Sequence, residues 1–231
     1  MIFARFFLSI LFFLILFTYV VQASTYIVAK DGSGDFTSIQ ACVSTVAGPG
    51  VVCSVKPGNY TEQVQITKAH SGNAVSGHFV IQNHTSKRPT LNGRFVETGP
   101  NGLIEAIGAS YIKIVGLEIT GYEGIGIFVR NGSAQHIEIR NNEIHHNRWT
   151  RHTRNAIKVH GQWPRFGGPF EITDVIVDGN YIHHVTTTIV NSTRGNEALT
   201  MAAHVERCQI TNNTIDTANN IGIDLIGSDK S

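Results

Sequence analysis

The stretch IKIVGLEI at 112–119 returns three more times along this chain. The later copies read IEIRNNEI at 137–144, VIVDGNYI at 175–182 and CQITNNTI at 208–215. Each copy has alternating apolar residues, a short turn that is rich in Asn and Gly, and a closing apolar residue. Such alternation is typical of half-buried β-strands, and Asn and Gly accept the left-handed backbone of tight turns. The repeat therefore predicts two short strands joined by a turn.

A further strand pattern follows each copy, at 124–129, 154–159, 196–201 and 220–225. The closing isoleucines of the four copies lie 25, 38 and 33 residues apart, at Ile119, Ile144, Ile182 and Ile215. Short strands that return at such intervals are typical of a solenoid, in which each turn of the chain stacks on the one before. A leucine-rich repeat is the alternative, but its leucine spacing and helical halves are absent. We therefore predict an all-β chain wound as a parallel β-helix.

Coils that stack about 4.8 Å apart pair their strands in parallel and align equivalent residues in columns. We expect one column of turn asparagines with amides bonded across the coils, at Asn142, Asn180 and Asn213. The further strand pattern leaves one outward column, made of Phe128, Lys158, Thr200 and Asp224. Cys208 falls in an inward column and is expected to be a buried apolar residue.

The N-terminal part predicts strands at 25–29, 51–55 and 63–67, with a turn at 56–61. Between the first two strands, residues 35–47 place four apolar side chains on one helical face: Phe36, Ile39, Val43 and Val46. Asp35 or Thr37 is expected to cap this helix. A short amphipathic helix here would cover the open end of the first coil.

The two ends of the chain carry different signals. Residues 1–23 place one charge, Arg5, before an apolar run and end in Val21, Gln22 and Ala23, which predicts a cleaved secretory signal peptide. The alternative is an uncleaved membrane anchor, since about 18 apolar residues nearly span a bilayer. The predicted mature β-helix is 24–231. Its strand pattern runs to the last residues without a capping helix, so we expect a C-terminally truncated solenoid.

Secretion implies an oxidising compartment, in which one pair of the three cysteines is expected to bond. Cys42 and Cys53 flank a short Gly-Pro-Gly connection and are the predicted disulfide. Five sequons are predicted sites of N-glycosylation: Asn59, Asn83, Asn131, Asn191 and Asn212.

Composition excludes several classes of protein. The chain is 42% apolar with a net charge of +1, so it is neither low-complexity disorder nor an electrostatic binder of nucleic acid. Its 23 glycines follow no three-residue period, which excludes collagen. We expect a monomer with no membrane attachment after signal cleavage.

The N-terminal sequence resembles that of known secreted proteins. Residues 26–40 (YIVAKDGSGDFTSIQ) and 55–62 (VKPGNYTE) are similar to the opening of right-handed parallel β-helix proteins of the pectin-lyase-like superfamily. The repeats of 110–227 resemble the coil repeat of that superfamily. The resemblance implies a right-handed, single-stranded β-helix and activity on acidic polysaccharides. It is nearest to the family-nine polysaccharide lyases, which implies a calcium ion bound by carboxylates and a lysine base.

Lyase chemistry needs a base next to the uronate carboxylate and positive charge to stabilise the resulting anion. Lys158 and Arg154 are the predicted catalytic residues, and Glu197 and Asp224 the predicted metal ligands. The long loops between 147 and 195 hold both tryptophans and five arginines of the chain, as an acidic sugar site requires. The predicted substrate-binding residues are Arg148, Trp149, Arg151, Trp163, Arg165 and Arg194.

Two further clusters allow two readings each. The histidine pairs 145–146 and 183–184 occupy matching positions, and they either stack between coils or bind a transition metal. Glu118 and Glu143 are neighbours in an outward column, where they either chelate a cation or lie apart in solvent.

We therefore expect a secreted polysaccharide lyase that acts on an acidic glycan such as pectate, with calcium as its cofactor. A non-catalytic carbohydrate-binding or surface β-helix is the first alternative. A glycoside hydrolase on the same fold is the second, because fold alone does not settle activity. The sequence does not name the glycan.

Overall fold

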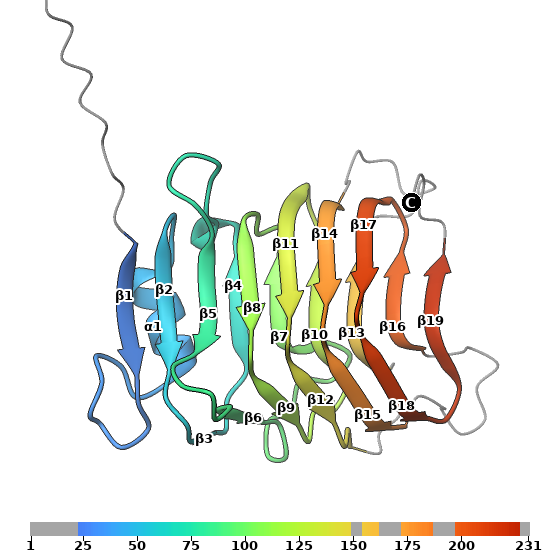
Figure 1. Cartoon of the computed structure of the whole chain (residues 1–231), viewed down its shortest axis with the longest axis horizontal. Coiled ribbons are helices and arrows are strands. Elements are labelled where there is room, and N and C mark those ends of the chain that lie inside the picture. The colour runs from blue at the N-terminus through green and yellow to red at the C-terminus, as the bar shows by residue number, and fades with distance from the viewer. Residues whose placement is uncertain (1–22, 149–153, 162–171, 187–196, 227–231) are drawn as a thin grey trace, which may run out of the picture.

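The computed structural model describes residues 23–148, 154–161, 172–186 and 197–226. Trp149, Arg151, Trp163, Arg165, Asn191 and Arg194 lie outside these ranges. The described chain winds as a single-stranded right-handed parallel β-helix, with strands side by side along the long axis (Figure 1). The predicted fold class is confirmed.

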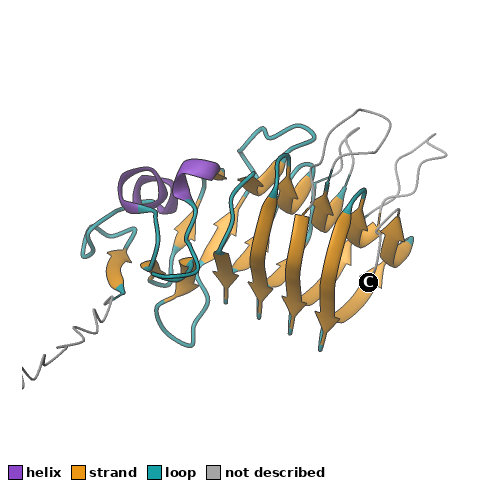
Figure 2. Ribbon diagram, turned by 90° about the horizontal axis from the view of Figure 1, so that it is seen from above, coloured by secondary structure: helices purple, strands orange, loops and turns teal. Residues whose placement is uncertain are grey.

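Three parallel sheets form the walls of the solenoid (Figure 2). Sheet A contains β1 (Ser24–Val28), β2 (Val51–Val55), β5 (Phe79–Asn83), β8 (Ile112–Val115), β11 (Ala134–Arg140), β14 (Ile172–Asp178) and β17 (Val205–Thr211). Sheet B contains β3 (Asn59–Tyr60), β6 (Thr90–Asn92), β9 (Glu118–Thr120), β12 (Glu143–His145), β15 (Tyr181–Val185) and β18 (Thr214–Ala218). Sheet C contains β4 (Val64–Thr67), β7 (Gly102–Ile107), β10 (Ile125–Arg130), β13 (Asn155–His160), β16 (Glu197–Ala202) and β19 (Ile221–Ile226).

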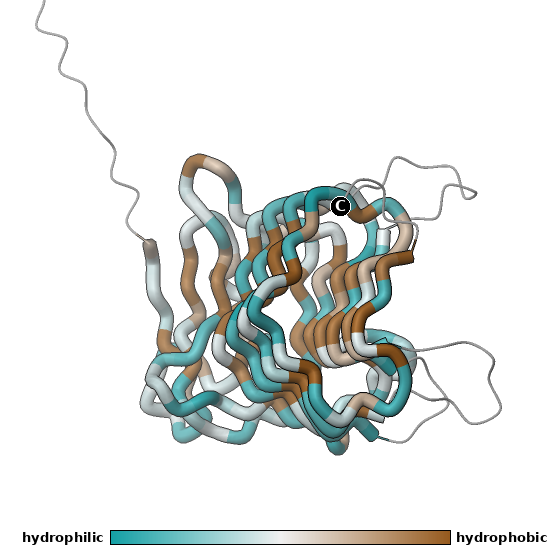
Figure 3. The backbone as a smooth tube through the Cα atoms, turned by 45° about the vertical axis from the view of Figure 1, so that its right-hand side comes forward, coloured by the Kyte–Doolittle hydropathy of each residue, from teal (hydrophilic) through white to brown (hydrophobic). Residues whose placement is uncertain are grey.

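The register matches the repeats of the sequence. Ile144 pairs with Ile119 on one side and with Ile182 on the other, and all three side chains are fully buried. Inward columns of this kind form the core, which is visible as apolar bands across the stacked coils (Figure 3). Cys208 pairs with Val175 as expected, but it is half-buried because it lies in the last coil of sheet A. In the last strand of sheet C, Ile223 and Leu225 are 46% and 48% exposed.

The predicted asparagine ladder forms at the turn between sheets A and B. Asn142 Nδ2 donates to Asn180 Oδ1 over 3.1 Å, and Asn180 Nδ2 donates to Asn213 Oδ1 over 2.9 Å. Asn142 and Asn180 are almost wholly buried, so these bonds satisfy amides that would otherwise be costly to bury.

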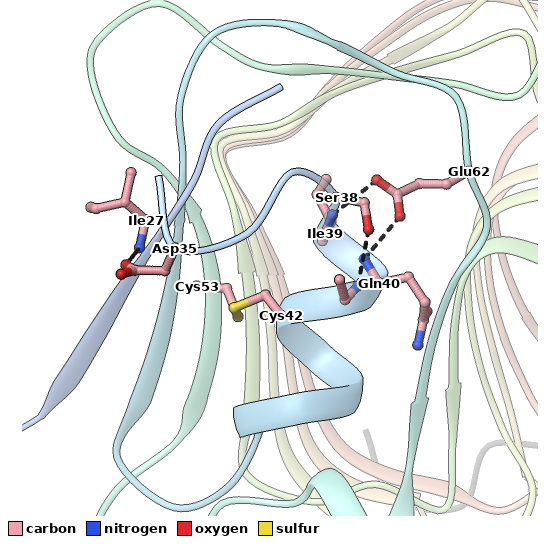
Figure 4. Close-up of a disulfide and its surroundings, with 9 residues drawn as sticks. Ile27, Asp35, Ser38, Ile39, Gln40, Cys42, Cys53 and Glu62 are labelled. Carbon is pink, nitrogen blue, oxygen red and sulfur yellow. Dashed lines mark hydrogen bonds between the residues drawn. A yellow bond between two sulfur atoms is a disulfide. The ribbon is translucent and has the colours of Figure 1, made fainter. Parts of the chain in front are cut away.

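The N-terminal helix forms, but its predicted cap is wrong. Helix α1 (Ile39–Val46) begins at Ser38, whose Oγ accepts from the Ala41 N–H, while Asp35 instead accepts from the Ile27 N–H. Both carboxylate oxygens of Glu62 accept helix N–H groups, from Ile39 and Gln40 (Figure 4). A carboxylate here also complements the positive end of the helix dipole.

The predicted disulfide is confirmed. It links Cys42 of α1 to Cys53 of β2, and both cysteines are fully buried (Figure 4). The bond therefore fixes the helix on the first coil.

The turn expected at 56–61 differs slightly from the prediction, because Asn59 and Tyr60 within it form strand β3.

Two short helical segments, α1 and the 3-10 turn η1 (Lys68–His70), interrupt the strands of the described chain. No helix of this part is long and apolar enough to span a bilayer. Residues 1–22, where the signal peptide is predicted, lie outside the description.

Candidate functional site

The outward column of sheet C contains Lys158, the residue that the sequence predicts as the catalytic base. Lys158 pairs with Phe128 on one side and with Thr200 on the other, and Thr200 pairs with Asp224. This is the column predicted from the alternation of the sequence. It continues on the far side of Phe128 to Glu105, which the prediction did not include.

Lys158 sits in a partly desolvated place within this column. Burial lowers the pKa of its ammonium group, and the nearby Glu197 carboxylate opposes that shift without cancelling it. Its Nζ lies 5.9 Å from the centre of the Phe128 ring. A lysine whose charged form is disfavoured holds a larger share of neutral amine, which is the form that accepts a proton.

Glu197 anchors a buried polar network beside the lysine. Its carboxylate accepts from the Thr200 hydroxyl over 2.7 Å and faces Asn155 Nδ2 at 3.3 Å. Asn155 Nδ2 also donates to the Glu197 carbonyl over 2.7 Å and contacts Thr200 Oγ1 at 2.8 Å. These contacts hold the carboxylate in place, where it favours the protonated form of Lys158.

On the other side of Phe128, Arg130 and Glu105 form an ion pair of 2.7 Å. The Glu105 carboxylate is almost fully buried, and the Arg130 guanidinium also lies 5.7 Å from the Phe128 ring centre. His160 pairs with Arg130 in the next coil, and its pKa is lowered by burial and then by the charge of Lys158. The site therefore combines an aromatic face, one paired arginine and a desolvated lysine.

The structure places the remaining predicted residues less favourably for substrate binding. Arg154 is only 1% exposed, and burial lowers the pKa of its guanidinium. Arg148 donates to the Val96 carbonyl over 2.7 Å and to the Glu123 carboxylate over 3.3 Å. Its guanidinium group therefore holds neighbouring segments of the protein together. The positions of the other predicted loop residues are not described.

Calcium does not fit the two predicted metal ligands as they stand. Calcium takes about six to eight oxygen ligands. In the described part of the chain, the Glu197 carboxylate accepts hydrogen bonds from Thr200 and Asn155. Glu197 and Asp224 as calcium ligands remain a prediction.

Sequence reasoning missed Glu105, Arg130 and Asn155. Extending the column one coil backward from Phe128 would have found Glu105, and Arg130 follows Phe128 by two residues on the same face of the same strand. Asn155 was missed because it is the first residue of its strand and the alternation turns this position inward, where an apolar residue is expected.

A groove of about 420 Å³ lies on the outer side of sheet A, on different strands from Lys158. It is lined by His78, His136, Glu138, Asp174, Ile176, Arg207, Cys208 and Gln209. His78 and His136 both contact the ring of Tyr111, with centroids 5.7 and 4.5 Å away. Lys113 pairs with Glu138 over 2.9 Å.

Comparison with solved structures gives two similar β-helices. A pectate lyase, Pel9A, aligns with a TM-score of 0.60 and 16% identity over 83% of this chain and 47% of its own. A rhamnogalacturonan lyase aligns with a TM-score of 0.60 and 12% identity over 89% of this chain and 62% of its own. This chain thus spans less than two thirds of either. No family model and no curated protein matches the sequence.

These likenesses support the parallel β-helix fold. Both neighbours are named as lyases of polysaccharides, but identities this low carry the fold alone.

Proposed function

We propose that this protein is a secreted polysaccharide lyase that cleaves an acidic glycan such as pectate, with Lys158 as the base. The observation that carries the proposal is the partly desolvated amine of Lys158 on the outer face of sheet C, with a lowered pKa. The names of both structural neighbours favour the same class of reaction.

The proposed reaction is a β-elimination. The neutral Nζ of Lys158 takes the proton from C5 of the uronate, and the C5–H electron pair becomes the C4=C5 double bond. The C4–O4 bond breaks, its electrons remain on O4, and that oxygen takes a proton from water. Lys158 then gives its extra proton to the resulting hydroxide, which restores both the neutral amine and the water. No water is added to the glycan, and the product carries one unsaturated uronate at its new non-reducing end.

Negative charge develops on the uronate carboxylate as the C5 proton leaves, so a cation should lie beside it. Arg154 is the arginine that the sequence predicts for this part, but its side chain is only 1% exposed, so it would act on the carboxylate by its charge rather than by a direct hydrogen bond. The aromatic face of Phe128 offers a surface on which a pyranose ring can stack, 5.9 Å from the amine. The loop residues predicted from sequence would complete the groove.

A glycan-binding protein without catalysis is the second candidate. The groove on sheet A supports it, because its two histidines contact the ring of Tyr111, one edge-on and one tilted, beside charged side chains. Paired acidic and basic groups there, including Asp174 with Arg207, can bond to sugar hydroxyls.

Secretion is part of the proposal and rests on the signal-like residues 1–23, the buried disulfide and the sequons. Four sequon asparagines lie in the described chain: Asn59, Asn131 and Asn212 are exposed, and Asn83 is half-buried. An acidic polysaccharide is the proposed partner, and the protein is proposed to act as a monomer.

A substrate screen tests the proposal. The purified protein is incubated with pectate, alginate and glycosaminoglycans, and both ultraviolet absorbance and reducing ends are recorded. A lyase yields equal amounts of both signals on at least one glycan. Reducing ends without absorbance indicate a hydrolase, and retardation on a glycan gel with neither signal indicates a binder.

A further inference from the structure

The outer face of sheet B carries a cluster of glutamates and histidines that the proposed reaction does not use. In two consecutive coils the same diagonal contact occurs. His145 Nε2 lies 3.1 Å from Glu118 Oε1, and His183 Nε2 lies 3.2 Å from Glu143 Oε1. Each contact joins one coil to the next, since β12 pairs with β9 and with β15.

A second histidine follows each of these and fixes its ring. His146 and His184 both have a φ of +50°, and their Nδ1 atoms lie 2.7 and 2.8 Å from Nδ1 of His145 and His183. Left-handed backbone is uncommon outside glycine and asparagine, and here it accompanies the contact between neighbouring rings. The rings of His145 and His183 are stacked, with centroids 4.8 Å apart.

These contacts resemble the surroundings of a metal-binding histidine. A ligating imidazole uses one nitrogen for the metal and bonds its other nitrogen to a neighbouring group, which fixes the tautomer. His146 and His184 stand where such neighbouring groups are needed, against the Nδ1 atoms. The Nε2 atoms face glutamate oxygens, so a metal ion bound there would take the place of these two hydrogen bonds.

The donor spacing is close to that of a small coordination shell. Glu143, His145 and His183 each offer one donor atom, and the three atoms lie within 4.8 Å of one another. Zinc bonds of about 2.0–2.1 Å at a tetrahedral angle place two donors about 3.3 Å apart. The 3.2 Å between Glu143 Oε1 and His183 Nε2 already meets that spacing, so His145 is the ligand that must move closer.

Charge also favours a cation at this place. The other Glu143 oxygen, Oε2, faces Arg88 Nη1 at 3.4 Å, which leaves Oε1 directed at the imidazoles. Glu118 lies beside Glu143 in register, so two carboxylates border the rings. Imidazole with carboxylate is a donor set for zinc and related ions, whereas calcium takes oxygen alone.

We propose that Glu143, His145 and His183 bind one divalent transition metal ion of the zinc class, which joins β12 to β15. Three protein ligands leave a fourth position for water. His146 and His184 act as positioning residues through the Nδ1 atoms. The inference is independent of the proposed lyase activity, because it concerns a different sheet.

Equilibrium dialysis of the full chain against Zn²⁺, followed by metal analysis, tests the site. One equivalent is expected per chain, and Co²⁺ in place of Zn²⁺ is expected to give a visible absorption band. His183→Ala and the isosteric Glu143→Gln should each weaken Zn²⁺ binding at least tenfold. His184→Ala should weaken it about 10- to 100-fold, as expected for a positioning residue.

His78→Ala is the matched control, because His78 also faces a glutamate, Glu138, at 3.7 Å, but lies outside this cluster. It should leave Zn²⁺ affinity unchanged. The thermal midpoint in EDTA shows whether each variant is folded. The proposal is overturned if no saturable equivalent binds, if folded Glu143→Gln binds as tightly as the parent, or if His78→Ala weakens binding equally.

Discussion

Asn142 Nδ2 donates to Asn180 Oδ1 over 3.1 Å between two residues that are 38 positions apart in the chain. Asn180 Oδ1 also accepts from the Asn142 backbone N–H over 3.0 Å, and Asn180 Nδ2 donates to the Ile139 carbonyl over 2.9 Å. One buried amide thus satisfies a backbone N–H, a backbone carbonyl and a side-chain amide of the preceding coil. The ladder fixes the turn between sheets A and B and the register that follows it.

Asn180→Ala should lower the free energy of unfolding by about 2–4 kcal/mol, because it leaves buried backbone groups without partners. Asn213→Ala should cost less, since Asn213 is half-buried in the last described coil. Urea unfolding of both variants measures this difference. Equal losses would show that burial within the ladder does not matter.

Removal of the disulfide should destabilise the N-terminal coil. Cys42→Ala with Cys53→Ala opens a loop with a sequence separation of 11 residues, for which about 2–3 kcal/mol is expected. Cys208→Ala is the matched control, because that thiol is free. The control should change the midpoint of urea unfolding far less than the double variant.

Asp174 should contribute a pH dependence to stability. Its hydrogen bonds to Arg207 lower its pKa from 3.8 to about 2. The stabilisation is therefore complete above about pH 4 and is lost as the pH falls through 2. Arg207 is 58% exposed, so solvent screening limits the effect to about 1 kcal/mol.

Asp174→Asn tests this contribution. Unfolding free energies of the parent and the variant should converge as the pH falls from 4 to 2. A constant difference across that range would mean that the carboxylate charge does not stabilise the fold.

The sequence predicted the coil register well because the repeats carry it directly. Ile119, Ile144 and Ile182 hold the same place in three copies, and a slip of one residue would turn each toward solvent. The column of Phe128, Lys158, Thr200 and Asp224 followed from the same alternation.

Side-chain direction was harder to predict. Ser38 rather than Asp35 caps α1, because Asp35 is drawn to the backbone of β1. Glu118 and Glu143 do not act as a carboxylate pair, since each faces a histidine of the next coil. These choices depend on diagonal distances between coils, which the repeat pattern does not encode.

Burial was a second limit. From the sequence, Arg154 is expected to be a loop arginine that is accessible to substrate, but its side chain is almost fully buried. The sequence predicts Glu197 as a metal ligand, and the structure shows that one of its carboxylate oxygens accepts hydrogen bonds from Thr200 and Asn155. In both cases the packing around the residue, which no local motif reveals, decides what the group can do.

The most direct test is the rate of unsaturated uronate formation by Lys158→Ala and Lys158→Arg, with Lys113→Ala as the control on sheet A. Loss of a general base is expected to lower the rate about 10²- to 10⁴-fold in both Lys158 variants and not in the control. The parent rate should rise with pH as the amine loses its proton, with a midpoint below the ordinary lysine value of 10.5. A folded Lys158→Ala variant that forms product at the parent rate would contradict the account.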